Sequence, residues 1–290
     1  MDVELKELED LHDAHNVHPL APESLNMGNV NKLVPNLRNK ERYILHRDNL
    51  LQYESLGLKI KKIHRGITFT ESPWLKKYID LNTSLRAKAT DNFEKDFFKL
   101  MNNSVFGKTM ENIRNRVDIR LITNAEEAKK LVSKPNFKHR TIFTDYLIAI
   151  HMNKTKVCYN KPIYLGMCIL DLSKTLMYDF HYNYMKKKYA DKASMLFTDT
   201  DSLAYEIETE DFYRDINPDI ERLFDTSNYE GKYCSDTWGM RGALPIANKK
   251  VPGMFKDEAG GKQILEFVGL RAKLYSYRMK HIEKQKMQRS

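Results

Sequence analysis

The spacing of hydrophobic residues predicts alternating helical and extended segments in the first third of the chain. Residues 41–57 carry hydrophobic side chains at helical spacing, and this range closes on a glycine, which is a stop signal. Residues 58–63 alternate between hydrophobic and polar side chains, which predicts a strand that continues toward Phe69. A further helix is expected over residues 72–82, whereas residues 1–40 are polar, contain three prolines and should form only short structure.

The clearest helical pattern covers residues 84–106. One mostly hydrophobic stripe runs along it and consists of Phe93, Phe97, Leu100, Met101 and Ser104. Lys95 and Lys99 lie four residues apart on a different face, and Gly107 is expected to end the helix. The pattern predicts an amphipathic helix with the two lysines away from its hydrophobic stripe.

The rest of the chain predicts a long helix and two hairpins. Pro162 occupies a favourable first-turn position for a helix that should reach Lys188. Alternating residues indicate one hairpin over 194–208 and a second over 254–268, with Gly260 and Gly261 in its turn. Shorter elements are expected before the long helix: a strand at 117–121, a helix at 125–131, and strands and turns over 135–159. The predicted fold class is therefore α+β, with an antiparallel sheet backed by the long helix.

Composition adds a moderate basic bias. The 290 residues include 48 Lys and Arg against 39 Asp and Glu, a net charge of +9, and 41% are hydrophobic. The hydrophobic content supports a folded core, and the charge favours a polyanionic partner. Residues 206–225 carry eight acids against two arginines and should form an acidic face that does not contact a polyanion. Residues 271–290 carry seven basic residues against one acid, which fits either a nucleic-acid groove or an exposed basic helix.

Several classes of protein are excluded by the sequence. Its three cysteines, Cys158, Cys168 and Cys234, form no C-x-x-C pair, so a disulfide framework and a zinc ribbon are ruled out. The acidic N-terminus has no apolar signal-peptide core, and no apolar run is long enough to span a bilayer. We expect an intracellular protein with no membrane partner. His12, His15 and His18 approach metal-ligand spacing, but Pro19 directly after them would break a helix and favours a solvated loop.

The sequence F-T-D-T-D-S at residues 197–202 is the sharpest chemical feature. Asp199 and Asp201 would project together from the tip of the first hairpin, where their charges repel unless a cation lies between them. Hard divalent ions such as Mg²⁺ prefer such oxygen ligands. The alternative is an ordinary turn in which both carboxylates are solvated. The predicted apolar strands on both sides favour the metal site.

The sequence K-L-M-N-N-S-V-F-G at residues 99–107 is the second chemical feature. Lys99 and Lys95 are point charges suited to a triphosphate, Phe106 could stack on a base or sugar, and Gly107 would allow close approach of a nucleotide. The alternative is a core helix with solvated lysines and a glycine cap.

Together these features resemble the family B DNA polymerases, which carry K-x-x-x-N-S-x-Y-G in the fingers, Y-x-D-T-D-S in the palm and a later K-x-Y. The last motif corresponds to Lys273, Leu274 and Tyr275. The order of the motifs and the helix at Pro162 are similar to the protein-primed, organellar and viral branch, and most similar to its Maverick/Polinton-like transposon group. Phe106 and Phe197 replace tyrosines of the motifs and keep the ring.

The resemblance implies a role for each matched residue. Asp201 would be the main metal-binding carboxylate and Asp199 its neighbour in a two-Mg²⁺ site, with Glu258 as a further candidate ligand. Lys95 and Lys99, with Arg86 or Lys88, would hold the triphosphate, and Asn103, Ser104, Phe106 and Gly107 would line the nucleotide pocket. Lys273 and Tyr275 would grip the primer. The implied partners are primer-template DNA and deoxynucleoside triphosphates, and the branch adds a terminal protein primer.

The resemblance also implies a division of the chain. Residues 1–83 would be a lead-in, 84–115 the fingers helix, 116–160 a small insertion, 161–277 the palm, and 278–290 a basic tail with a shortened thumb. The family's D-x-x-S/N-L-Y motif, which supplies another metal-binding Asp, does not precede Lys99, and Asp48 and Asp80 lie in predicted helices.

We therefore expect a partial polymerase without the exonuclease domain, weakly active or inactive by itself. The alternatives are a DNA-binding remnant from a mobile element and, less favoured, a metal-dependent nuclease that uses Asp199 and Asp201.

Overall fold

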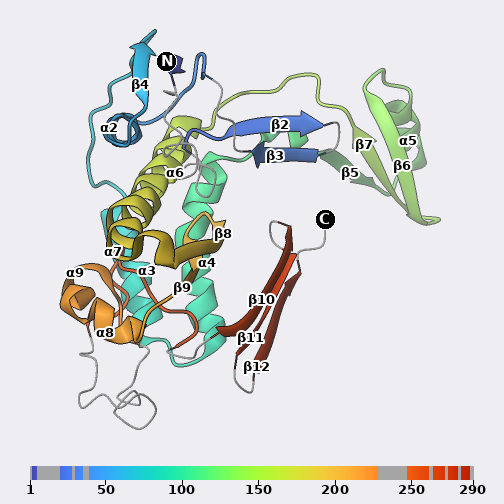
Figure 1. The fold of residues 1–290 in the computed structure, drawn as a ribbon. Helices are drawn as coiled ribbons and strands as arrows, with labels where there is room; N and C mark the ends of the chain where they lie inside the picture. The colour runs from blue at the N-terminus through green and yellow to red at the C-terminus, as the bar shows by residue number, and fades with distance from the viewer. Residues whose placement is uncertain are drawn as a thin grey trace. The chain divides into compact units, whose positions relative to one another are not determined.

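The computed structural model describes residues 2–4, 20–27, 30–34, 39–227, 247–260, 264–271, 274–279 and 282–287. The chain divides into two compact units. The terminal unit combines Met1–Ser72 with Leu170–Ser290, and the inserted unit is Pro73–Ile169. Helices and antiparallel sheets form separate segments of both units, so the predicted α+β class is confirmed (Figure 1). Predictions made for His12, His15, His18, Cys234, Gly261 and Lys273 lie outside the described residues.

The inserted unit begins with two helices, as the pattern predicted, but the break between them lies later than expected. Helix α3 covers Lys76–Lys88 and α4 covers Asn92–Thr109. The break arises because Ala89 is extended and the Asp91 carboxylate caps α4 by accepting from the Glu94 N–H at 2.8 Å. The prediction that Gly107 ends the helix is also wrong, since α4 continues to Thr109.

The predicted hydrophobic stripe of α4 is not buried. Phe93 is 79% exposed and Leu100 is 63% exposed. Helix α4 instead contacts α3 through polar groups, since the Tyr78 hydroxyl donates to the Met101 carbonyl at 3.2 Å. The stripe is therefore exposed in the described structure, and the alternative of a core helix is wrong.

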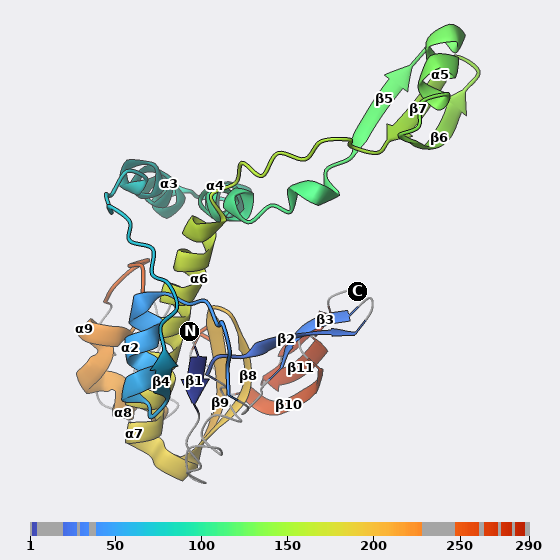
Figure 2. The same cartoon turned by 90° about the horizontal axis from the view of Figure 1, so that it is seen from above.

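A small sheet completes the inserted unit. Strands β5 (Asp118–Ile122), β6 (Phe137–Thr144) and β7 (Leu147–Met152) form an antiparallel sheet in the order β5-β7-β6. Helix α5 (Ala125–Val132) lies against one face of this sheet (Figure 2). The small core consists of Ile122, Ala128, Leu131, Ile150 and Met152. These elements confirm the predicted strands and short helix of this region.

A long helix forms the frame of the terminal unit. It consists of α6 (Ile163–Tyr178), a π-helical segment (Asp179–Met185) and α7 (Lys186–Tyr189), which confirms the predicted extent to within a residue. Helix α2 (Arg47–Ser55) packs beside α6 through Tyr53 and Tyr178, whose ring centroids are 5.9 Å apart (Figures 1 and 2). None of the described helices is long and apolar enough to cross a membrane.

The N-terminal part of the terminal unit is made of short elements. Strand β1 (Asp2–Glu4) pairs with β4 (Lys59–Lys62), and β2 (Glu23–Met27) pairs with β3 (Val30–Val34). Helix α2 starts six residues later than predicted because His46 caps it, and it ends as predicted before Gly57, whose φ is 101°. The predicted extension of β4 toward Phe69 is wrong, since the strand stops at Lys62.

The first predicted hairpin is confirmed and the second is wrong. Strands β8 (Ala193–Asp199) and β9 (Ser202–Ile207) pair antiparallel. Residues 254–258 form no hairpin arm, because Phe255 bridges Phe224 and stacks on Phe180 at 3.8 Å. Strand β10 (Ile264–Arg271) pairs instead with β11 (Leu274–Met279), which pairs with β12 (Ile282–Met287), so the C-terminal region is a sheet and not a basic helix. In the sequence, α8 (Phe212–Ile216) and α9 (Ile220–Leu223) lie between β9 and β10.

Candidate active site

The tip of the β8–β9 hairpin presents both predicted metal-binding carboxylates. Asp199 is half-buried at the last strand position, opposite Ser202, and Asp201 is exposed in the turn. The Asp201 N–H donates to the Asp199 carbonyl at 2.5 Å, and Thr200 between them has a φ of 48°. A positive φ is rare and strained for a β-branched residue such as threonine. Strain of this kind persists only where surrounding contacts hold the backbone in place.

A β-bulge lies four residues before the tip. Met195 pairs with Tyr205 and Phe197 pairs with Ala204, so Leu196 is an extra residue in β8. A bulge bends its strand and changes the direction in which later side chains point. The bulge therefore sets the orientation of Phe197 and the residues that follow it.

Phe197 joins the hairpin to the C-terminal sheet. Its ring stacks on Tyr275 of β11 at 4.4 Å and on Phe267 of β10 at 5.7 Å. Two segments that are 78 positions apart in the sequence thus meet through aromatic contacts worth about 0.5–1.5 kcal/mol each beyond buried area. The structure brings Tyr275 of the K-x-Y motif next to the hairpin, whereas its Lys273 lies outside the described residues.

The donor set at the tip is chemically suited to Mg²⁺ but small. Carboxylate oxygens are the ligands that Mg²⁺ takes, with water and phosphate oxygens filling the remaining positions. Glu258 is exposed in the turn region after Phe255. Among the residues that the structure describes, no three His, Cys, Asp or Glu side chains are grouped to hold a metal ion. Asp80 lies in α3, as predicted, and pairs with Lys76 at 2.6 Å.

The predicted nucleotide-binding residues follow α4 of the inserted unit. Lys95, Lys99 and Asn103 recur every four residues, so they share one face of the helix, and Lys99 and Asn103 are exposed. Phe106 and Gly107 continue that face, and a side chain added at Gly107 would meet no atom within 4 Å. Ser104 instead turns its hydroxyl back to the Met101 carbonyl at 2.8 Å. Arg86 and Lys88 lie in the last turn of the neighbouring α3.

A family comparison matches most of the chain. The model of the family described as DNA polymerase type B, organellar and viral, matches residues 2–187. The chain belongs to this family. Membership implies a DNA template and nucleotide substrates. The match ends before the β8–β9 hairpin, so Asp199 and Asp201 rest on their own motif and geometry. No curated protein and no solved structure matches the chain.

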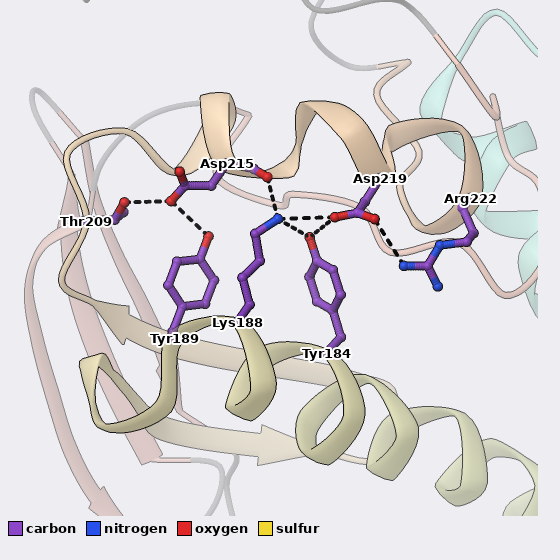
Figure 3. Close-up of polar contacts among 7 residues, drawn as sticks. All are labelled: Tyr184, Lys188, Tyr189, Thr209, Asp215, Asp219 and Arg222. Carbon is purple, nitrogen blue, oxygen red and sulfur yellow. Dashed lines mark hydrogen bonds and ion pairs between the residues drawn. The ribbon is translucent and has the colours of Figure 1, made fainter.

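A polar cluster that the sequence did not reveal joins the end of the long helix to residues 209–222, which follow the hairpin in this type B polymerase chain (Figure 3). Lys188 of α7 donates to the Asp219 carboxylate at 3.1 Å and also contacts the Asp215 carbonyl. The Tyr184 hydroxyl donates to Asp219 at 3.0 Å. The other contacts of this cluster, which we call the clamp, join Asp219 to Arg222 at 3.1 Å and Asp215 to Tyr189 at 3.2 Å and Thr209 at 2.6 Å.

The clamp explains part of the acidic region. Partial burial of Asp219 opposes its charged form, but hydrogen bonds from Arg222, Lys188 and Tyr184 prevail and lower its pKa. Asp215 and Asp219 thus face the protein's own helix. The complementary charges of residues 186–188 and 206–225 were the only signal of this pairing in the sequence.

An open basic cavity of about 400 Å³ lies at the end of the small sheet where the chain enters β5 and leaves β7. Its basic lining residues are Arg116, Arg120, Lys154 and Lys156, and Asp118 is the one acid among them. Arg116 pairs with Glu111 at 2.6 Å and Arg120 contacts Asp118 at 3.5 Å. The two lysines are exposed. They leave the cavity positively charged, as an anionic ligand requires.

Proposed function

We propose that the chain is a DNA-directed DNA polymerase that transfers deoxynucleotides from their triphosphates to a primer. The observation that carries this proposal is the β8–β9 tip, where a strained turn holds Asp199 and Asp201 together while Phe197 stacks on Tyr275. Family membership supports the reaction class. We also assign the chain to the Maverick/Polinton-like group, for which its motif spacing is the support.

In this proposal each motif has one task. Asp201 and Asp199 hold Mg²⁺, which when bound neutralises charge that develops on the phosphates. Lys95 and Lys99 bind the triphosphate, and Asn103 and Phe106 line the nucleotide pocket.

The DNA contacts complete the proposal. Tyr275, with Lys273 beside it in sequence, holds the primer terminus, whose 3′-hydroxyl attacks the α-phosphate and releases pyrophosphate. A terminal protein is the proposed source of the primer.

Primer extension by the full chain tests this function. With Mg²⁺ and all four triphosphates, we expect weak template-dependent extension that is lost in Asp201→Asn, because a ligand of the reacting centre is removed. Asp145→Asn is the matched control, since Asp145 lies in the turn of the β6–β7 hairpin and should have no effect. Extension that survives Asp201→Asn contradicts the proposal.

A second function has one observation in its favour. The described residues hold no group of three potential metal ligands, which fits a mobile-element remnant that binds DNA without extending it. Salt-sensitive DNA binding with no extension by the wild type or by Asp201→Asn would support the remnant. Degradation of a labelled primer that is lost in Asp201→Asn would support the nuclease. An upstream reading frame that encodes D-x-x-S/N-L-Y at the same locus would favour the polymerase.

A further inference from the structure

A buried histidine lies directly beneath the β8–β9 hairpin. His181 is 1% exposed, and its Nδ1 is 2.9 Å from the hydroxyl oxygen of Tyr205 on β9. The two rings are nearly parallel, at 15°, with centroids 5.9 Å apart. A buried polar side chain is costly unless it is hydrogen-bonded, so this pair constrains both partners.

A π-helical segment places His181 at this position. The Lys186 N–H donates to the His181 carbonyl five residues earlier, which is the π-helical pattern, and the segment covers Asp179–Met185. The helix must satisfy two packing surfaces at once. Tyr178 and Tyr182 join the cluster around Tyr53, whereas Phe180 and Met185 join the cluster that contains the hairpin. The wider π-helical turn lets consecutive residues contact both hydrophobic clusters, and it turns His181 toward Tyr205.

The contact bears on the hairpin tip through β9. Tyr205 lies four residues after Asp201 and pairs with Met195 at the edge of the β8 bulge. A β-bulge leaves one residue of its strand unpaired and disrupts the hydrogen-bond ladder locally, and a strained turn needs outside contacts to hold its conformation. The Tyr205 hydroxyl is anchored to the rigid long helix at the strand position where the bulge loosens the pairing.

We propose that His181 is a positioning residue that, through the Tyr205 hydroxyl, fixes the β8–β9 register and so sets the spacing of Asp199 and Asp201. The effect on metal affinity rests on the proposed function, whereas the effect on the hairpin itself does not.

Two measurements on the full chain test this proposal. The first is Mn²⁺ binding by electron paramagnetic resonance, with Mn²⁺ as the probe. Tyr205→Phe removes only the hydroxyl and keeps the ring, and we expect it to weaken binding about three- to tenfold, the range of one lost hydrogen bond. His181→Leu should have the same effect, and His181→Asn should restore most of the affinity because its amide can replace Nδ1.

The matched control is Tyr184→Phe. Tyr184 also carries a hydrogen-bonded hydroxyl on the long helix, but it contacts Asp219 of the clamp. We expect this variant to lower the melting temperature about as much as Tyr205→Phe and to leave Mn²⁺ affinity unchanged. Equal affinities of Tyr205→Phe and wild type, or equal weakening in both tyrosine variants, would overturn the proposal.

The second measurement is hydrogen–deuterium exchange over residues 193–207, which needs no metal. Faster exchange in Tyr205→Phe than in Tyr184→Phe is expected, and equal exchange contradicts the positioning role. If the wild type binds no Mn²⁺ beyond an Asp199→Asn/Asp201→Asn double variant, the proposed metal site fails. The exchange result then still decides whether His181 and Tyr205 position the hairpin.

Discussion

Thr200 is the residue at which local conformation and proposed function conflict most clearly. Its φ of 48° lies in the left-handed region, which costs a residue with a Cβ roughly 1–2 kcal/mol. Glycine would adopt the same backbone freely, although it would also loosen the unfolded chain. In the proposed metal site, threonine at this position keeps a stiff turn between the two carboxylates.

Replacing Thr200 by glycine should therefore stabilise the fold and weaken the site. We expect Thr200→Gly to raise the free energy of unfolding by up to about 1 kcal/mol, because relief of strain exceeds the entropic cost of glycine. Primer extension should fall at the same time, because the carboxylates lose their fixed spacing. Urea denaturation and the extension assay measure the two effects.

Thr198→Gly provides the comparison, since Thr198 is exposed on β8 and its φ is not positive. There glycine should destabilise the strand by about 0.5–1 kcal/mol. Destabilisation by Thr200→Gly of the same size as by Thr198→Gly would show that the turn is not strained.

At the scale of elements, local patterns predicted what depends on neighbouring residues. The period-two alternation of β8 and β9, the short α5 and the long helix up to Tyr189 all followed from spacing alone. Failures occurred where a distant partner or a single cap decides. The Asp91 cap starts α4 and so interrupts the helix expected over residues 84–106. Phe255 stacks on Phe180 instead of forming the expected hairpin arm.

The candidate site divides in the same way. The motif identified Asp199 and Asp201, because a turn between two strands is a local feature. It could not show that Phe197 stacks on Tyr275 or that His181 reaches Tyr205, since these contacts join segments 78 and 24 residues apart. Nor does composition reveal a π-helical segment, which arises from packing on two sides.

The clamp makes an acid-sensitive contribution to stability. The pKa of Asp219 is lowered in the folded state, so below about pH 4, the ordinary aspartate value, the unfolded chain binds more protons. The contribution is complete above that pH and is lost as pH falls through the lowered pKa. We expect Lys188→Met to flatten the pH dependence of unfolding in this acid range, measured by chemical denaturation at a series of pH values.

A double-variant cycle gives the size of the contact. Lys188 and Asp219 are about one-quarter exposed, with side-chain exposures of 27% and 23%, so a coupling of about 1 kcal/mol is expected between Lys188→Met and Asp219→Asn. Lys187→Met is the control, because Lys187 is exposed on the same helix and should neither change the acid range nor couple to Asp219→Asn. A coupling near zero would show that the clamp's contacts do not act together.

At the scale of the whole molecule, the net charge of +9 conceals an uneven distribution. The acidic region from residue 206 to 225 is partly neutralised by the clamp, whereas the inserted unit places exposed Lys154 and Lys156 on a basic cavity. A DNA-binding surface should therefore include this cavity, and the overall charge should matter less than these two lysines.

DNA affinity measured against salt concentration tests that distribution. Each phosphate contact contributes about 0.7–0.9 to the slope of log K against log salt, so Lys154→Gln/Lys156→Gln should reduce the slope by about 1.5. Lys129→Gln/Lys130→Gln removes the same charge from two exposed positions of helix α5 in the same unit and should change the slope little. Equal slopes for the two double variants would mean that DNA affinity depends only on the net charge of the protein. The cavity would then not contact DNA phosphates.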